Sequence, residues 1–459
     1  MSESLRSVGL DVGTTTTQLI VSELKVENRA SGFAVPEMEI TERQILYRGE
    51  VQFTPLKEEK LVDGAALRRM VEEEYKKAGL RREDVDTGAV IITGETSRKE
   101  NARAVLNALS EFSGEFVVAT AGPHLESVLA AKGAGAVEYS QQTGKTVLHI
   151  DIGGGTSNLA LIQEGRILRT GCLNVGGRLL KLDRAGRVTY CSEVLKGLCH
   201  IKVGDCPGEA ELTELARVLV QALEMAAGLR PEGALLEQLT TRETGEQWRP
   251  PEVGAVLSFS GGVADCIEQI HEALAFGDIG PILGREIRKS LLCSGAHRLG
   301  TETIRATVIG AGCHSAQLSG STVFHRGVSL PIKNLPVEVF TGQEQASSQL
   351  PELIARRISQ KDSGEVVLAM PGYKAASYGQ VTALAEAIVQ GTAGKSIYVC
   401  LEEDMAKALG HALCLRMDSQ IPCLCIDRVR LQEESFLDVG EPVGPCLPVV
   451  IKTLVLSRG

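Results

Sequence analysis

The fold of this chain is decided by the stretch Thr146-Val-Leu-His-Ile-Asp-Ile-Gly-Gly-Gly-Thr-Ser-Asn158. An apolar strand ends at Asp151, three glycines and a threonine follow, and a second apolar strand continues over 159–162. Glycines without side chains let backbone N–H groups approach phosphate oxygens closely, and Asp151 at the strand end can point into a cleft. The pattern therefore predicts a β-hairpin that contacts phosphate. An ordinary glycine-rich turn is the alternative interpretation, because Gly and Asp are also common turn residues.

The same pattern occurs again near the N-terminus. There an apolar strand that starts at Ser7 ends in Asp11-Val-Gly-Thr-Thr15, and a second apolar strand continues to Val21. The two aspartates are 140 positions apart (151 minus 11), which is about one domain length. We therefore expect two similar units, each with one phosphate-facing hairpin, and the carboxylates of Asp11 and Asp151 to face each other across a cleft.

A third glycine-rich loop follows a buried strand later in the chain. Residues 255–265 read Ala-Val-Leu-Ser-Phe-Ser-Gly-Gly-Val-Ala-Asp, in which an apolar strand enters the pair Gly261 and Gly262 and then a helix. Glycine turns between a strand and a helix often carry ligands in α/β proteins. The loop therefore predicts a third contact with the ligand.

Strands and helices alternate along most of the sequence, as in an α/β protein. Helices are expected at 68–78, 121–131, 209–227 and 307–318, and strands at 88–93 and 116–119. The stretch 228–251 contains Pro, Gly, charged residues and the single tryptophan, and it predicts an insertion or surface loop. Beyond about residue 331 the pattern predicts a compact α/β extension, with strands at 365–369, 396–401 and 423–426 and helices at 379–390 and 404–416.

The composition excludes several classes of function. The chain has 48 Lys and Arg against 58 Asp and Glu, and its net charge of −10 argues against nucleic acid and anionic lipid as partners. The N-terminus lacks the pattern of a signal peptide and no apolar run is long enough to span a membrane, which predicts a cytosolic protein without a membrane anchor. The 12 cysteines are expected to be reduced thiols, most of them buried. Cys423 and Cys425 are interpreted as pointing to opposite faces of a strand, a poor geometry for a metal site.

Three glycine-rich loops in this order resemble the actin-like ATPase superfamily of actin, Hsp70-type chaperones and sugar kinases. Asp11–Thr15 matches the first phosphate motif of that superfamily, Asp151–Thr156 the second and Phe259–Asp265 the adenosine motif. The resemblance implies an α/β, actin-like (ribonuclease-H-like) ATPase fold with two lobes, duplicated β-hairpin phosphate loops and a C-terminal α/β extension. The implied domains are lobe I over 1–135, lobe II over 136–325 with an insertion near 228–254, and the extension over 326–459.

The superfamily resemblance also implies roles for the motif residues, with ATP and Mg²⁺ as cofactors. Asp11 and Asp151 would bind Mg²⁺ through water and are the candidate catalytic residues, with Asp151 favoured to orient the attacking water. The nucleotide would be bound by Gly13, Thr14, Thr15, Gly153, Gly154, Gly155, Thr156, Gly261 and Gly262. Residues 121–131 and 308–318 look like the two helices on which the lobes hinge.

Three residues depart from the Hsp70 pattern. Asn158 stands where that pattern has a second aspartate, and Gly122 stands where chaperones carry a catalytic glutamate, so slow ATP hydrolysis is expected. Asp265 replaces a basic residue that would stack on adenine, which predicts weaker or different contacts with the base.

Several other polar residues lie near the motifs. Glu95 and Lys99 could approach the γ-phosphate, but an ordinary solvated loop is the favoured interpretation. His149 and His314 are interpreted as packed, hydrogen-bonded histidines, not as ligands for cobalt. Glu126 is interpreted either as a helix-start carboxylate stabilised by the helix dipole or as a group that touches the cleft.

Within the superfamily, residues 9–18, 92–102, 149–158 and 258–265 resemble the family of ethanolamine ammonia-lyase reactivating factors, as does the chain length. That resemblance implies an ATP-dependent, chaperone-like factor with ethanolamine ammonia-lyase as its protein client. The factor would promote the exchange of damaged cobalamin for intact adenosylcobalamin. It would act in the cytoplasm; association with a bacterial microcompartment and assembly into a homo-oligomer are left open.

Two other functions use the same fold. A small-molecule kinase of the sugar or acetate type would need a polar acceptor pocket beside the γ-phosphate, and the sequence contains no clear acceptor motif. A filament or membrane-tethered cytoskeletal protein is disfavoured because no terminal amphipathic anchor is present.

Overall fold

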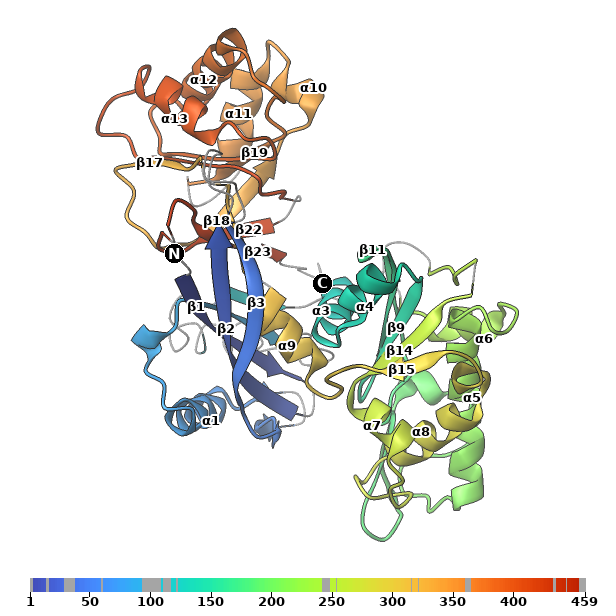
Figure 1. The fold of residues 1–459 in the computed structure, drawn as a ribbon. Helices are drawn as coiled ribbons and strands as arrows, with labels where there is room; N and C mark the ends of the chain where they lie inside the picture. The colour runs from blue at the N-terminus through green and yellow to red at the C-terminus, as the bar shows by residue number, and fades with distance from the viewer. Residues whose placement is uncertain are drawn as a thin grey trace.

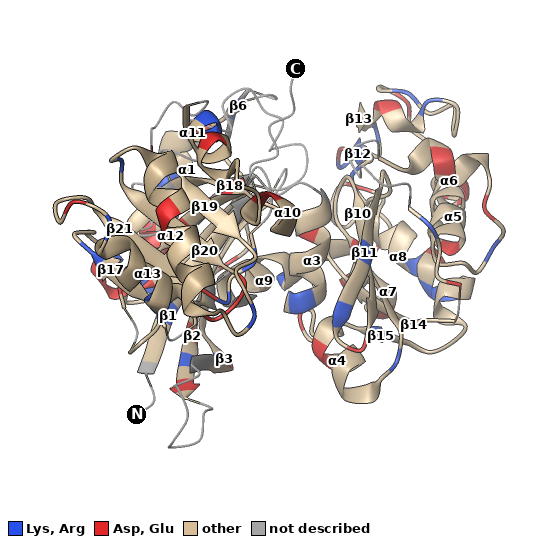
Figure 2. Ribbon diagram, turned by 90° about the horizontal axis from the view of Figure 1, so that it is seen from above, with Lys and Arg blue, Asp and Glu red and all other residues tan. Residues whose placement is uncertain are grey.

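The computed structural model of the chain describes residues 3–13, 16–28, 38–58, 61–92, 109, 117–120, 123–241, 248–252, 254–314, 316–320, 322–359, 365–431, 435–442 and 444–453. In these residues most strands belong to three large sheets. The first and second sheets lie on either side of a central pair of helices (Figure 1). The third sheet and its helices lie over the first sheet and away from the second (Figure 2).

The first sheet has the strand order β3-β2-β1-β7-β8, and β4 pairs with the start of β2. Its strands are β1 (Glu3–Val12), β2 (Thr16–Asn28), β3 (Met38–Arg48), β4 (Gln52–Phe53), β7 (Thr87–Ile92) and β8 (Val117–Thr120). Strand β1 pairs antiparallel with β2 and parallel with β7. One face of the sheet packs against α1 (Gly64–Lys77), which is capped by Asp63 at its N-terminus.

The second sheet repeats this arrangement in the order β11-β10-β9-β14-β15. Its strands are β9 (Val147–Ile152), β10 (Ser157–Gln163), β11 (Arg166–Leu173), β14 (Val256–Ser260) and β15 (His297–Leu299). Its helices are α5 (Glu209–Ala226), α6 (Ala234–Leu239), α7 (Gly262–Glu268) and α8 (Gly280–Lys289), which share one apolar core with one face of the sheet. Strand β9 is antiparallel to β10 and parallel to β14, as β1 is to β2 and β7. This duplication confirms the two-lobed, actin-like α/β fold.

Two helices connect the lobes, and each packs on the sheet of the lobe that it enters. Helix α3 (Pro123–Gly133) follows β8 of the first sheet but packs on β9, β10 and β11 of the second. Helix α9 (Ala306–His314) follows β15 of the second sheet but packs on β1, β2 and β7 of the first. The short helix α4 (Ala136–Thr143) continues from α3. The two connecting helices pack against each other between the sheets (Figure 1).

Glycines make the contact between α3 and α9 as close as it is. A Cβ on Gly133 would lie 1.8 Å from the carbonyl oxygen of Ala306, and one on Gly310 would lie 2.0 Å from that of Leu129. Both clashes are with backbone atoms, so no side-chain movement could relieve them. Small residues at these positions therefore permit the close packing of the two helices.

The third sheet has eight strands in the order β16-β23-β22-β18-β19-β20-β21-β17. They are β16 (Ala316–Leu318), β17 (Phe324–Arg326), β18 (Ile332–Val339), β19 (Val367–Met370), β20 (Ile397–Leu401), β21 (Cys423–Ile426), β22 (Ser435–Val439) and β23 (Pro448–Thr453). Its helices are α10 (Gly342–Gln345), α11 (Leu350–Ser359), α12 (Tyr378–Thr392) and α13 (Ala406–Cys414). The strands and helices predicted over 365–426 agree with β19, α12, β20, α13 and β21. The sheet also includes β16 and β17, which begin before residue 326, and the predicted domain limits stay predictions.

The third sheet shares a core with the connecting helices. Val450 of β23 packs with Ala89 and Ile91 of β7, Leu129 of α3 and Ala311 of α9. A movement of α3 against α9 would therefore reach β23 directly. The remaining elements are the hairpins β5 (Leu56–Glu58) with β6 (Leu61–Val62) and β12 (Leu180–Leu182) with β13 (Val188–Cys191), and the 3-10 turns Arg82–Asp84, Glu193–Leu195 and Leu291–Cys293.

The stretch 228–251 differs from the expected surface loop. It contains α6, and Trp248 is only 4% exposed. The indole N–H donates to the carbonyl oxygen of Ala226 at 3.0 Å, and the ring occupies the space beside Gly171. The single tryptophan therefore belongs to the core of the second lobe, because its partners come from β11 and α5.

Two further predictions need correction. The helix expected over 307–318 ends at His314, and 316–318 form β16, whose partner β23 lies more than 100 residues later in the sequence. Cys423 and Cys425 lie on the same face of β21, since side chains two residues apart on a strand point the same way. Their Sγ atoms are 4.0 Å apart and both are buried in the core between the sheet and its helices.

The contact between the connecting helices should be sensitive to a single methyl group. Replacing Gly310 by Ala forces α3 and α9 apart, and we expect a loss of at least about 2 kcal/mol in the free energy of unfolding. Gly379→Ala in α12 is the matched control, because nothing lies within 4 Å of its Cβ position. The control should be neutral or stabilise the protein by up to about 1 kcal/mol. Urea denaturation measures both, and equal stability of the two variants would contradict the assignment.

Candidate active site

The two predicted phosphate hairpins share a strand register and a closing hydrogen bond. Asp11 lies opposite Gln18 across the first hairpin, and Asp151 lies opposite Asn158 across the second. The N–H of Gly13 donates to the carbonyl oxygen of Thr16 at 2.9 Å, and the N–H of Gly153 donates to that of Thr156 at the same distance. The repeated sequence pattern therefore corresponds to a repeated strand pairing. Thr14 and Thr15 lie outside the described residues.

Strand alternation places both aspartates on the sheet faces that carry the connecting helices. In β1, Val8, Leu10 and Val12 face the α1 core, whereas Gly9 lies against α9. Asp11 is two residues beyond Gly9 and so shares its face. In β9, Leu148, Ile150 and Ile152 face the core that contains α5, α7 and α8, so Asp151 lies on the opposite face, against which α3 packs.

Asp151 is held by a buried chain of hydrogen bonds. Ser260, its neighbour on β14, donates its hydroxyl proton to Oδ1 of Asp151. Nε2 of His149 lies 2.9 Å from the same hydroxyl oxygen, and Nδ1 of His149 lies 3.2 Å from that of Ser258. Since the Ser260 proton is used by Asp151, His149 must donate from Nε2, and its Nδ1 accepts from Ser258. His149 is thus a packed, hydrogen-bonded histidine, as predicted.

Burial shifts the pKa values of Asp151 and His149, the two ionisable groups in this series of hydrogen bonds. Desolvation raises the pKa of Asp151 to about 6, although the hydrogen bond from Ser260 opposes the change. Desolvation and the charge of Arg298 lower the pKa of His149 to about 3. The histidine is therefore neutral near neutral pH, which agrees with its role as a donor from one nitrogen and an acceptor at the other.

The third glycine loop fits closely around the end of β9. Gly261 has a φ of +88°, and a Cβ there would lie 2.3 Å from the carbonyl oxygen of Ile152. Only glycine allows both this conformation and this approach. The nearest atom to a Cβ on Gly262 is a side-chain carbon of Ile304 at 3.8 Å. Gly261 is required by packing, whereas a Cβ on Gly262 would make only ordinary van der Waals contacts.

The second hairpin borders open space at Gly155. A Cβ on Gly155 would meet nothing within 4 Å, and one on Gly153 would come no closer than 3.4 Å to another atom. In the described part of the chain, the N–H groups of Gly154 and Gly155 have no hydrogen-bond acceptor. The hairpin therefore presents free backbone donors beside a buried carboxylate, an arrangement that fits a bound anion such as phosphate.

The residues opposite the two aspartates connect each hairpin to a helix region. Nδ2 of Asn158 donates to Oε2 of the buried Glu126 on α3 at 2.9 Å. Nε2 of Gln18 donates to the carbonyl oxygen of Ile304, just before α9, at 3.1 Å. Glu126 thus contacts the second strand of the second hairpin, which explains why an asparagine is suited to position 158.

Sequence reasoning missed two groups beside the second hairpin, Arg178 and Asp278. The backbone N–H of Arg178 donates to the carbonyl oxygen of Gly154 at 2.6 Å, and its Nε donates to Oδ2 of Asp278 at 3.0 Å. The glycine pair in Gly176-Gly177-Arg178 is the signal that could have located this loop, since a Cβ on Gly176 would lie 2.3 Å from the carbonyl oxygen of Gly154. Ser260 had a weaker signal, namely two serines on one face of an apolar strand.

The structure does not bear on every candidate residue. Gly122, Glu95 and Lys99 lie outside the described residues, and the side chain of His314 is not described. Asp265 accepts a hydrogen bond from the hydroxyl of Thr303. It therefore has a structural partner in the loop that precedes α9.

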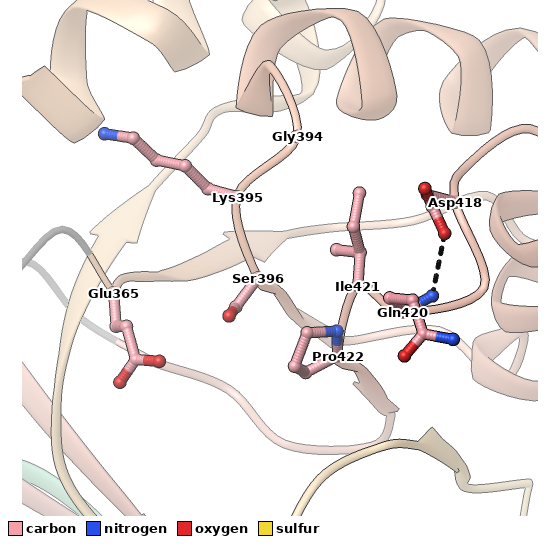
Figure 3. Close-up of a pocket in the computed structure, with 8 residues that line it drawn as sticks. All are labelled: Glu365, Gly394, Lys395, Ser396, Asp418, Gln420, Ile421 and Pro422. Atoms are coloured by element: carbon pink, nitrogen blue, oxygen red, sulfur yellow. Dashed lines mark hydrogen bonds between the residues drawn. The ribbon is translucent and has the colours of Figure 1, made fainter.

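A separate depression of about 640 Å³ lies in the third unit (Figure 3). It is lined by Glu365, Gly394, Lys395, Ser396, Asp418, Gln420, Ile421 and Pro422. These residues stand at the amino ends of β19, β20 and β21, whereas ligands of open α/β sheets bind at the carboxyl ends. Figure 3 shows the Lys395 side chain directed away from Glu365. The carboxylate of Asp418 accepts a hydrogen bond from the backbone N–H of Gln420 at 3.0 Å. No set of polar groups converges there among the residues drawn.

The described residues contain neither a metal-binding cluster of side chains nor a membrane-spanning helix. In that part of the chain, no group of three or more His, Cys, Asp or Glu side chains is arranged to hold a metal ion. None of the described helices has the length and apolar character needed to cross a membrane.

Known proteins resemble this chain over almost its whole length. The profile of the family described as "Ethanolamine utilisation protein EutA" matches residues 3–457. The ethanolamine ammonia-lyase reactivase EutA of Escherichia coli strain K12 is 37% identical over 472 aligned residues, and that of Salmonella typhimurium strain LT2 is 36% identical over 475; each alignment covers 99% of both chains. The crystal structure of the Aquifex aeolicus member of the Ppx/GppA family covers 68% of this chain and 88% of its own, with 15% identity and a TM-score of 0.37. On the full-length sequence matches, the chain belongs to the EutA family of ethanolamine utilisation proteins.

Proposed function

We propose that this chain is an ATP-dependent, chaperone-like reactivating factor for ethanolamine ammonia-lyase. In this role it promotes the exchange of damaged cobalamin in the lyase for intact adenosylcobalamin. The full-length relatives are named as reactivases of that lyase, which supports the choice of client. The observation that carries the proposal is the pair of hairpins, which have the same strand register. Their aspartates lie on the sheet faces against which the connecting helices α3 and α9 pack, one in each lobe. We also propose that the protein works in the cytoplasm with its client.

The proposed nucleotide contacts are the glycine loops. Free backbone donors and the absence of side chains support Gly154 and Gly155 as phosphate contacts. Gly153 and Thr156 close the same turn and are proposed with them, and Gly13, Thr14 and Thr15 are proposed from the repeated pattern. Gly261 and Gly262 are proposed to border the nucleoside. Asp11 and Asp151 are proposed to hold Mg²⁺ through water, since magnesium keeps several waters when few carboxylates are available. Bound Mg²⁺ would neutralise charge on the phosphate oxygens.

Asp151 is the proposed orienting group for the attacking water. Its carboxylate is fixed by the donor Ser260, which is itself fixed by His149, so its position is set before any ligand binds. Phosphoryl transfer depends mainly on positioning and charge neutralisation, and a fixed carboxylate suits that need. Glu126 bonds to Asn158 and so has a structural partner, which supports the expectation of slow hydrolysis.

Coupling to the client would run through the connecting helices. The helices α3 and α9 are fixed to opposite sheets and to each other, and Val450 links them to the third unit. A change in the angle between the lobes would therefore change the surface that the third unit presents. For useful work, the ATP and ADP states must differ in affinity for the client by at least about 1 kcal/mol.

A reactivation assay tests the proposal and the role of Asp151. Lyase inactivated with cyanocobalamin is incubated with this protein, ATP, Mg²⁺ and adenosylcobalamin, and ethanolamine deamination is followed. We expect recovery with the wild type and at least about a hundredfold slower recovery with Asp151→Asn, because the amide lacks the negative charge. Asp205→Asn, in an exposed loop of the second lobe, is the control and should keep full activity.

Two outcomes of this assay would be decisive against the proposal. No recovery beyond a sample without the protein would remove the reactivase function. Wild-type recovery with Asp151→Asn would remove Asp151 from the mechanism. ATP consumption should also not rise on addition of sugars or short carboxylates, and strong stimulation by them would favour a kinase.

The burial of Asp151 predicts a gain in stability when its charge is removed. Folding raises its pKa from 3.8 to about 6, so the folded protein holds more protons between these pH values and loses stability as the pH rises through them. Above pH 6 the cost is on the order of 3 kcal/mol. Without nucleotide or Mg²⁺, Asp151→Asn should therefore be about 1–3 kcal/mol more stable than the wild type at pH 7.5, with the difference vanishing near pH 4. Urea denaturation at both pH values measures this, and a variant that is less stable at pH 7.5 would contradict it.

A further inference from the structure

Arg178 is the cation that the structure places against the second phosphate hairpin. Its backbone N–H bonds to the carbonyl oxygen of Gly154, and its Cβ, Cγ and Cδ lie 3.5–3.6 Å from the position that a Cβ on Gly154 would occupy. The aliphatic part of the side chain therefore lies directly on the hairpin. These separations are ordinary van der Waals distances, so the arginine stem packs on the hairpin without strain.

Asp278 fixes the direction of the Arg178 guanidinium. Its Oδ2 accepts from Nε of Arg178 at 3.0 Å, and its Oδ1 accepts from the backbone N–H of Gly280 at 2.8 Å. Desolvation raises the pKa of Asp278, whereas the bonds to Gly280 and Arg178 oppose the rise. The side chain of Asp278 is 8% exposed and that of Arg178 is 24% exposed. The carboxylate is thus a buried anchor, and the guanidinium extends from it toward solvent.

The guanidinium also reaches the opposite lobe. Its Cζ lies 5.9 Å from the ring centroid of Phe53, which is on β4 of the first sheet. Phe53 pairs with Thr16 at the end of the first hairpin, and the hydroxyl of the adjacent Thr54 donates to the carbonyl oxygen of Gly13 at 2.8 Å. The contact between Arg178 and Phe53 therefore joins the surroundings of the two hairpins across the space between the lobes.

Most of the hydrogen-bonding capacity of Arg178 is still available. Only Nε is used by Asp278, and within the described residues neither Nη atom has a hydrogen-bond acceptor. A guanidinium with free N–H groups suits a phosphate, which it can bind through two parallel hydrogen bonds. An arginine needed only to neutralise Asp278 would have no reason to lie on a glycine hairpin and to touch the other lobe.

We propose that Arg178 binds the terminal phosphate of a nucleoside triphosphate held between the two hairpins. Asp278 is the positioning residue that aims the guanidinium, and Phe53 marks the side of the first lobe that closes on it. Loss of the terminal phosphate would leave Arg178 in contact with Asp278 and Phe53 alone. The residue would then distinguish the ATP state from the ADP state. This inference rests on the proposed binding of ATP.

Equilibrium binding separates this role from a structural one. Calorimetric titration with ADP and with a non-hydrolysable ATP analogue, both with Mg²⁺, gives two affinities for each variant. For Arg178→Gln we expect the affinity for the analogue to fall about 10–100-fold and that for ADP to fall less than about threefold. Arg178→Lys keeps the charge but not the planar fork, and its loss of analogue affinity should lie between these limits.

The chain offers a matched control for the loss of an ion pair. Arg217 of α5 donates from Nε to the buried Glu286 of α8 at 3.1 Å, on the same lobe but without contact to a hairpin. Arg217→Gln should change neither affinity by more than about twofold. The urea denaturation midpoints of Arg178→Gln and Arg217→Gln show whether both variants fold. If Arg178→Gln does not fold, the nucleotide affinities of Arg178→Lys test the proposal instead.

The outcomes separate this inference from the proposed function. If the wild type binds neither nucleotide, the proposed ATP-dependent function fails and this inference fails with it. If the wild type binds both and the Arg178 variants lose affinity for ADP and the analogue equally, or lose neither, the assignment to the terminal phosphate is wrong while ATP binding stands. Phe53→Leu should leave the ratio of the two affinities within about twofold of the wild type, because its ring does not bind phosphate.

Discussion

The close crossing of α3 and α9 is the constraint on which the two-lobed arrangement depends. Backbone lies against backbone at Gly133 and Gly310, so the helices have little freedom to separate and can move mainly by sliding or turning on each other. Each helix is fixed to the sheet that it enters. Asn158 donates a hydrogen bond to Glu126 of α3, and Gln18 donates one to the carbonyl oxygen of Ile304, just before α9. These bonds join each hairpin to the region of the helix pair.

At the chain of Asp151, Ser260 and His149, the proposed function of the carboxylate opposes stability. All three side chains are buried, and the carboxylate has a raised pKa because burial disfavours its charge. A hydrocarbon side chain at position 151 would pack without that penalty, but it could not orient water or interact with a hydrated cation. The serine and the histidine limit the penalty by giving the carboxylate one fixed donor. The same bonds leave it in one orientation, which a solvated aspartate would not have.

Local patterns in the sequence predicted much of the fold. The hairpins at Asp11 and Asp151, the glycine loop at Gly261 and the run from β19 to β21 in the third unit follow from strand alternation, helical spacing and turn residues, all of which act within about ten residues. Features that depend on distant partners could not be predicted in this way. Trp248 is buried because α5 and β11 surround it, and Arg178 gains its position from Gly154 on one side and Asp278 on the other. The face of Cys423 and Cys425 was open to prediction, and the error there lay in the application of the strand period.

The last strand of the third sheet imposes an order on the assembly of the protein. Val450 completes the apolar cluster formed by Ala89, Ile91, Leu129 and Ala311, although it follows the first of these by more than 300 residues in the sequence. On a ribosome, the apolar surface formed by β7, α3 and α9 would therefore stay exposed until β23 has been synthesised and has paired with β16 and β22. Contacts so distant in sequence form slowly, because a long loop must close before they contribute. The region where the two connecting helices meet the first sheet is thus among the last to become fully packed.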